Sequence, residues 1–142
     1  MKIAVVTGAS SGMGLEFAKA IDAEETLDEI WLIARRGDRL EALAKELRAP
    51  ARILTLDLGR PESFEEYKKL LEAEKPLIST LCNAAGFGRF ALFTETELDV
   101  NLAMIDLNDK ALVAMTQLSL PWMKRGSRVI NLDSLSAFQP VP

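Results

Sequence analysis

The chain contains no histidine among its 142 residues. Ser-His-Asp hydrolysis and Cys-His catalysis both use an imidazole as the general base, so neither mechanism is available to these residues. A histidine-ligated metal site is excluded for the same reason, and we predict that the chain holds no metal ion.

Cysteine, long apolar runs and positive charge are also scarce. Cys82 is the only cysteine, so no internal disulfide can form, and this usage suits the reducing cytoplasm. No apolar run approaches the ~20 residues that span a bilayer, and the first residues lead straight into a strand-like run rather than a signal peptide. The net charge of −4, with dispersed basic residues, disfavours binding to nucleic acid or to an anionic membrane. We therefore expect a cytoplasmic protein with neither partner.

What is present is an alternation of short β-rich runs with longer segments of helical periodicity. The predicted strands cover residues 2–7, 29–34, 52–57, 77–83 and 127–132. The predicted helices cover residues 11–24, 38–48, 61–74 and roughly 97–124, with Pro121 as a candidate kink in the last. Apolar strands alternating with helices favour right-handed crossovers and a parallel sheet covered on both faces. We predict one α/β domain over residues 1–142, a doubly wound, three-layer Rossmann fold with strand order 3-2-1-4-5.

The turn after the first predicted strand carries the clearest chemical signal. Residues 7–14 read TGASSGMG, which spaces Gly8, Gly12 and Gly14 as GxxxGxG. Glycines at such a turn permit a tight bend, close approach of the backbone to a pyrophosphate, and close packing of helix on strand. The following helix offers unpaired N–H groups and a positive dipole end. Placement between a strand and a helix predicts a dinucleotide site rather than an ordinary turn.

Five ordered motifs together resemble the short-chain dehydrogenase/reductase family. They are TGASSGMG, the acid Asp57 at the end of the third strand, NAAG at 83–86, Asn108 in the long helix, and the serine in VINLDSLSAF at 129–138. The resemblance implies that a nicotinamide dinucleotide is held by three segments and the end of the second strand. The implied contact residues are Gly8, Ser10, Ser11, Gly12, Met13, Gly14, Arg35, Asp57, Leu58, Asn83, Ala84, Ala85 and Gly86.

The end of the second predicted strand indicates which nucleotide. An NAD enzyme usually places an acid there to hold the ribose hydroxyls. This chain instead has Ala34, Arg35 and Arg36. A guanidinium holds a 2′-phosphate well because its planar fork donates two hydrogen bonds at once. We therefore favour NADP(H) over NAD(H), with more weight on Arg35 than on Arg36, although both arginines also suit the solvated start of a helix.

The family moves a hydride between the nicotinamide and a carbonyl or alcohol carbon, so the resemblance implies a small-molecule substrate of that kind. Ser134 falls on the serine that polarises the substrate carbonyl, and Asn108 on the asparagine that supports a water relay. A serine at a strand end also caps local backbone, and Ser136 is a nearby competitor. A mid-helix asparagine such as Asn101 also lies on a solvent face. Asn108 has apolar neighbours, so we expect it to be partly buried.

The family's acid–base pair has no counterpart in the sequence. The resemblance implies a tyrosine and, four residues later, a lysine that lowers the tyrosine's pKa. That motif is expected farther on than the eight residues that follow Ser134. The only tyrosine, Tyr67, is followed at the fourth position by Leu71. We therefore expect an N-terminal portion that stops after the fifth strand, and predict that it does not turn over substrate alone.

Two other functions stay open. One is a catalytically inactive nucleotide-binding or assembly module, and the other a Rossmann methyltransferase, which the paired TGxxxGxG and NAAG motifs disfavour. A bare fifth strand and a long helix without its neighbour would drive association, so we predict a homo-oligomer. The segment 87–93, with three phenylalanines, either forms the wall of a substrate pocket or anchors its own loop. Cys82 is expected to be a small buried apolar residue.

Overall fold

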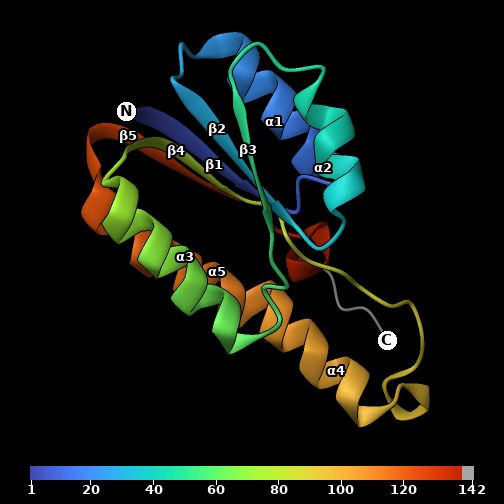
Figure 1. Cartoon of the computed structure of the whole chain (residues 1–142). Coiled ribbons are helices and arrows are strands. Elements are labelled where there is room, and N and C mark those ends of the chain that lie inside the picture. Colours follow the sequence, from blue (N-terminus) through green and yellow to red (C-terminus); the bar gives the residue numbers. More distant parts are fainter. Residues whose placement is uncertain (139–142) are drawn as a thin grey trace.

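The computed structural model describes residues 1–138, which form a five-stranded parallel sheet between helices (Figure 1). The strands are β1 (Lys2–Thr7), β2 (Glu29–Ala34), β3 (Ala51–Thr55), β4 (Leu77–Asn83) and β5 (Met123–Asn131). Their order across the sheet is β3-β2-β1-β4-β5, and every neighbouring pair is parallel. The predicted doubly wound topology is confirmed.

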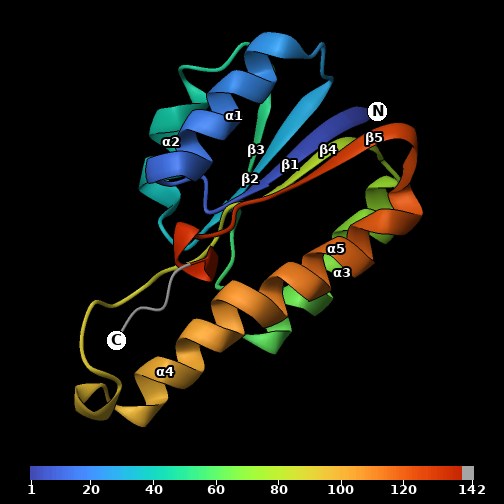
Figure 2. The ribbon, with the colours of Figure 1, turned by 180° about the vertical axis from the view of Figure 1, so that it is seen from behind.

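Helices cover both faces of the sheet, as Figures 1 and 2 show from opposite sides. On one face lie α1 (Gly12–Glu24) and α2 (Gly37–Ala44). On the other lie α3 (Pro61–Glu74) and α5 (Ala111–Ser119), while α4 (Leu98–Ile105) projects beyond the sheet. Among residues 1–138, no helix is both long and apolar enough to cross a membrane.

The central strand β1 shows why the strands read as continuous apolar runs. Ile3 and Val5 belong to the hydrophobic core beneath α3 and α5. Ala4 and Val6 belong to a second core beneath α1 and α2. Successive side chains of a strand point to opposite faces, and here both faces are covered, so the four central positions of β1, residues 3–6, are all buried and apolar.

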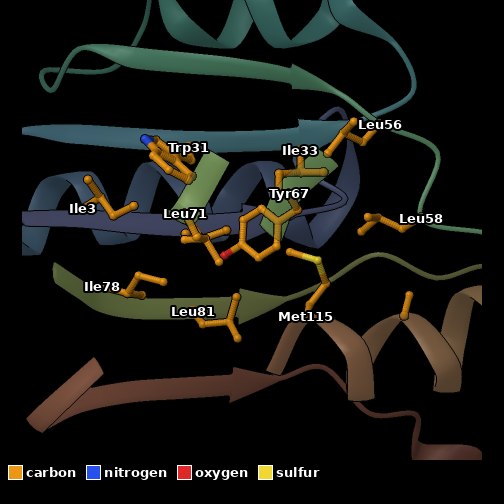
Figure 3. Close-up of a cluster of buried hydrophobic side chains, with 12 residues drawn as sticks. Ile3, Trp31, Ile33, Leu56, Leu58, Tyr67, Leu71, Ile78, Leu81 and Met115 are labelled. Atoms are coloured by element: carbon orange, nitrogen blue, oxygen red, sulfur yellow. The ribbon is translucent and has the colours of Figure 1, made fainter. Parts of the chain in front are cut away.

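The core beneath α3 and α5 contains Tyr67, the only tyrosine of the chain (Figure 3). Its ring meets that of Trp31 edge to face, with the ring centroids 6.4 Å apart. Its hydroxyl oxygen lies 2.8 Å from the hydroxyl oxygen of Ser119 in a buried hydrogen bond. Tyr67 therefore ties α3 to α5 inside the core.

Two elements end earlier than the sequence predicts. Strand β3 ends at Thr55 instead of 57, because Asp57 turns the chain by accepting a hydrogen bond from the backbone N–H of Gly59. Helix α2 ends at Ala44 instead of 48. The buried carboxylate of Asp22 accepts the backbone N–H groups of Arg48 and Ala49, at 2.8 and 2.9 Å, and so holds that segment outside the helix.

The long predicted helix is not continuous. A π-helical turn, Asp106–Lys110, separates α4 from α5, and a 3₁₀ turn, Leu120–Trp122, closes the segment. Pro121 lies in that closing turn, so it ends the helix instead of kinking it. Strand β5 then begins at Met123, earlier than the predicted residue 127, with an irregularity beside Gly126, whose φ is +95°.

Candidate functional site

The turns after β1 and β4 are locked together at the carboxyl edge of the sheet. The hydroxyl oxygen of Thr7 accepts the backbone N–H groups of Ala84 and Ala85, each at 3.0 Å. Gly8 has φ +66°, and a Cβ there would lie 2.6 Å from the carbonyl oxygen of Ala84. Only glycine fits this close approach, which explains the first glycine of the loop.

The other two glycines have different tasks. A Cβ on Gly14 would collide with the carbonyl of Gly8, so Gly14 lets α1 pack against the turn. Gly12 opens α1 with φ +58° and has nothing within 4 Å of the position of a Cβ. Ser11, the residue that precedes α1, makes no side-chain capping hydrogen bond. The helix N-terminus therefore presents an open backbone cradle of the kind that binds phosphate.

The two arginines after β2 behave differently. Arg35 is exposed at the rim of the loop. Arg36 reaches across to the glycine loop, where its Nη2 donates to the hydroxyl oxygens of Ser10 at 3.2 Å and Ser11 at 2.9 Å. A guanidinium beside a helix N-terminus gives this corner positive charge and several hydrogen-bond donors.

A cavity of about 300 Å³ lies between these segments. It is lined by every residue that the sequence assigns to the nucleotide except Asn83, namely Gly8, Ser10, Ser11, Gly12, Met13, Gly14, Arg35, Asp57, Leu58, Ala84, Ala85 and Gly86. Further lining residues are Ile33, Ala34, Arg36, Leu56 and Leu107. Most of these adjoin predicted residues at strand ends. Leu107 comes from the distant π turn, and its position next to Asn108 is the only sequence signal for it.

Asn83 points into the protein instead of the cavity. Its side chain is 5% exposed, and its Nδ2 donates to the hydroxyl oxygen of Thr116 at 3.0 Å and to Oδ1 of Asn131 at 2.9 Å. Its own Oδ1 is buried without a hydrogen-bond partner among the described residues. Asn83 therefore joins the end of β4 to α5 and to the end of β5, and the prediction that it lines the nucleotide cavity is not supported by this geometry.

Asn108 lies in the π turn, and its side chain is exposed, so the prediction of partial burial is wrong. Its Oδ1 accepts the backbone N–H of Phe87 at 2.9 Å, and its Nδ2 donates to the carbonyl oxygen of Phe87 at 2.8 Å. A Cβ on Gly86 would lie 2.9 Å from the same Oδ1. The amide thus anchors the loop after β4, and Gly86 leaves room for it.

The model of the protein family described as "short chain dehydrogenase" matches residues 2–142 of this chain. The chain belongs to the short-chain dehydrogenase family. It is 32% identical over 141 residues to an uncharacterized oxidoreductase of Staphylococcus epidermidis, and the match covers 98% of this chain and 60% of that protein.

Solved structures of short-chain dehydrogenases share this fold. One, from Sphingobium yanoikuyae in complex with NADPH, is similar with a TM-score of 0.85 and 28% identity, over 99% of this chain and 56% of that chain. Another, the closed form of serine dehydrogenase complexed with NADP⁺, is similar with a TM-score of 0.83 and 30% identity, over 99% of this chain and 56% of that chain. The chain therefore spans little more than half the length of these relatives.

Ser134, the predicted catalytic serine of this short-chain dehydrogenase, lies just beyond β5 and is exposed. Its hydroxyl oxygen accepts the backbone N–H of Ser136 at 3.1 Å, and its own N–H donates to Oδ1 of Asp133 at 2.8 Å. Ser134 does not line the cavity, and no hydrogen bond among residues 1–138 joins it to Asn108. Capping of local backbone by this serine, which the sequence analysis kept as the alternative to a catalytic role, is therefore present.

The hydroxyl of Tyr67 and the thiol of Cys82, two titratable groups considered in the sequence analysis, are buried and do not line the cavity. Burial raises the pKa of Tyr67, which the hydrogen bond to Ser119 only partly offsets. Burial also raises the pKa of the Cys82 thiol to about 11, and the predicted buried, apolar character of Cys82 is confirmed. Within residues 1–138, no group of three or more His, Cys, Asp or Glu side chains is arranged to hold a metal ion.

Proposed function

We propose that this chain forms the NADP(H)-binding portion of an oxidoreductase that transfers a hydride between the nicotinamide and a small carbonyl or alcohol substrate. The observation that carries this proposal is the cavity of about 300 Å³ in front of Gly12 at the start of α1. Ligand pockets in proteins begin at about this size. The cradle in front of Gly12 suits a pyrophosphate, and the nicotinamide supplies the hydride-carrying carbon when the dinucleotide is bound.

NADP(H) is preferred over NAD(H) because the end of β2 has cations and no acid. Arg35 and Arg36 both line the cavity, and Arg36 already lies against Ser10 and Ser11. A ribose 2′-phosphate at this corner would lie near two guanidinium groups, which come from adjacent residues. NADPH and NADP⁺ in the two solved relatives support this choice.

Calorimetric titration of the chain with NADPH and with NADH tests this proposal. We expect NADPH to bind at least ~10-fold more tightly, which corresponds to about 1.4 kcal/mol. The double variant Arg35→Ala/Arg36→Ala should remove the preference, whereas Arg125→Ala, an exposed arginine in β5, should not change it. Equal affinity for both nucleotides in the unaltered chain would refute the NADP(H) preference.

Catalysis needs groups that this chain does not bring together. Ser134 is proposed to polarise the substrate carbonyl, which requires its hydroxyl to turn from the N–H of Ser136 toward the substrate. Asn108 is proposed to act by positioning the loop that begins at Phe87. Tyr67 cannot act as the acid–base group, because it is 0% exposed and bonded to Ser119. We therefore propose that this chain alone binds nucleotide without turnover. We also propose that it does so in the cytoplasm.

Assembly is the second proposed role, and exposed apolar side chains favour it. Leu98, Leu102 and Ile105 of α4 are 71%, 51% and 54% exposed, and Val113 of α5 is 60% exposed. Large exposed apolar surfaces usually mark an interface. We propose a homo-oligomer formed through this surface. Sedimentation of the chain and of a Leu98→Ser/Leu102→Ser variant tests it, since a monomer for the unaltered chain at high concentration would contradict it.

A further inference from the structure

Met13, the second residue of α1, is the most exposed of the five methionines of the chain. It is 64% exposed, whereas Met1 is 47% exposed, Met115 is fully buried, and Met104 and Met123 are half-buried. All five lie within residues 1–138, and of these only Met13 lines the nucleotide cavity. The family pattern TGxxxGxG leaves residue 13 open, so a thioether at this place is a feature of this chain.

Two spaces give solvent access to the Met13 side chain. One is the nucleotide cavity, and the other is an open groove of about 570 Å³, whose wall also includes Phe17 and Arg39. The preceding glycine, Gly12, has nothing within 4 Å of the position of a Cβ, so the turn is uncovered there as well. A small solute in water can therefore reach the Met13 thioether.

The chain's only thiol, that of Cys82, is withdrawn from solvent. Peroxides oxidise thiolates and accessible thioethers. Burial raises the pKa of the Cys82 thiol to about 11, so very little thiolate is present near neutral pH. Met13 is therefore the sulfur-containing residue best placed to meet an oxidant.

We propose that Met13 is a site of reversible oxidation by a hydroperoxide, and that its sulfoxide lowers the affinity of the cavity for the dinucleotide. This inference rests on the proposed NADP(H) function. A lone pair of the thioether sulfur forms a bond to one peroxide oxygen while the O–O bond breaks. The proton of the transferred oxygen passes to the leaving oxygen, so hydrogen peroxide is reduced to water as the sulfur is oxidised by two electrons. Two thiols of a sulfoxide reductase reverse the change, becoming a disulfide as the oxygen leaves as water.

The sulfoxide would compete with the phosphates for the donors of the cradle. Oxidation turns an apolar side chain into a polar one, whose oxygen accepts hydrogen bonds. The N–H groups at the start of α1 are available, because Ser11 makes no side-chain capping hydrogen bond. An acceptor on the second residue of this helix lies near those donors, and its partial negative charge opposes an anion in the same place. Oxidised Met13 therefore weakens the dinucleotide.

The experiment compares NADPH binding to the whole chain before and after treatment with hydrogen peroxide. The peroxide is removed by desalting, oxidised residues are located by peptide mass spectrometry, and NADPH is titrated by calorimetry. We expect Met13 to be oxidised well before the buried Met115. The dissociation constant for NADPH should rise about tenfold as the Met13 sulfoxide accumulates. Methionine sulfoxide reductases with dithiothreitol should restore the original value.

Two leucine variants separate Met13 from the other methionines. Met13→Leu removes the thioether and keeps an apolar side chain of similar volume. Whatever its own affinity for NADPH, that affinity should be the same before and after peroxide. Met104→Leu is the matched control, because Met104 is half-buried in α4 and does not line the cavity. This variant should lose affinity on oxidation as the unaltered chain does.

The outcomes separate this inference from the function beneath it. If the unaltered chain does not bind NADPH, the proposed function fails and the inference fails with it. If NADPH binds and complete oxidation of Met13 leaves the dissociation constant unchanged, only the inference is overturned. An equal loss of affinity in oxidised Met13→Leu would assign the effect to other residues, and oxidation of Met115 as fast as Met13 would refute the selective site. Either result also overturns the inference.

Discussion

The side-chain amide of Asn108 forms two hydrogen bonds with the backbone of Phe87, one from Nδ2 to the carbonyl oxygen at 2.8 Å and one to Oδ1 from the N–H at 2.9 Å. The pair joins a π turn in the long helix to the loop that leaves the nucleotide cavity. A π turn inside an otherwise α-helical segment often marks a functional position. Here it places an amide where it can hold the backbone of the loop at Phe87.

Replacing Asn108 should therefore loosen that loop. Asn108→Ala removes both hydrogen bonds, and at about 0.5–1.5 kcal/mol each the free energy of unfolding should fall by about 1–2 kcal/mol. Hydrogen exchange at the N–H of Phe87 should accelerate. Asn101→Ala, in α4, is the matched control and should alter neither quantity, because the side chain of Asn101 forms no hydrogen bond within residues 1–138. Unchanged exchange at Phe87 in Asn108→Ala would contradict the anchoring role.

The buried amide of Asn83 depends on Thr116 for one of its partners. Thr116→Val deletes the accepting hydroxyl at nearly constant shape and leaves part of a buried amide unpaired. We expect a loss of about 1–3 kcal/mol in the free energy of unfolding, measured by urea titration. Thr116→Ser restores the hydroxyl and should recover most of that loss. Equal stability of the Val and Ser variants would show that the hydrogen bond contributes nothing.

Acid should destabilise the fold through Glu25. Burial alone would raise the pKa of this carboxyl, but hydrogen bonds from Thr80 and Arg128 and the ion pair with Lys2 lower it from 4.5 to about 2. Because the folded pKa lies below the unfolded one, this stabilisation is present above about pH 5 and is lost as the pH falls toward 2. At ~1.4 kcal/mol per pKa unit the loss amounts to a few kcal/mol.

Urea midpoints between pH 2 and pH 7 measure this dependence. Glu25→Gln should have a lower midpoint at pH 7 and a flatter pH profile than the unaltered chain. Glu24→Gln is the control, because the Glu24 side chain is 69% exposed. If Glu25→Gln keeps the full acid sensitivity, other carboxylates are responsible for it.

Alanine at two glycines of the nucleotide turn, Gly8 and Gly12, should have distinct effects. Gly8→Ala places a Cβ 2.6 Å from the carbonyl oxygen of Ala84 at a positive φ, so we expect a loss of about 1–3 kcal/mol in stability together with loss of NADPH binding. Gly12→Ala has the strained φ of +58° without the clash. This variant should lose less stability than Gly8→Ala but should still bind NADPH more weakly. Gly88→Ala, in open space, should be neutral. Thermal unfolding and NADPH titration of the three variants distinguish these results.

The sequence predicted the order of the strands because that order follows from alternation and buried apolar runs, both of which are local patterns. It also predicted most of the cavity, since the glycine loop, Asp57 and the turn after β4 all follow strand ends that meet at one edge. The direction of single side chains was not predictable in the same way. Asn83 turns inward because its partners, Thr116 and Asn131, come from distant segments.

Two further differences have similar physical causes. Arg35 and Arg36 are adjacent in sequence, and only the fold shows that Arg36 is the one that reaches Ser10 and Ser11. The π turn carries no proline or glycine, so periodicity alone predicted an unbroken helix through Asn108. Long-range hydrogen bonds decide the first case.

Amide NMR spectra of the ¹⁵N-labelled chain during titration with NADPH give the most direct test of the central claim, that the open turn at the start of α1 binds the dinucleotide. We predict saturable shifts at the backbone N–H groups of Gly12, Gly14 and Gly86, which line the cavity. The N–H of Gly126, in the irregular part of β5, should not move. Absence of saturable shifts at Gly12 and Gly14, or larger shifts at Gly126 than at either, would contradict the claim.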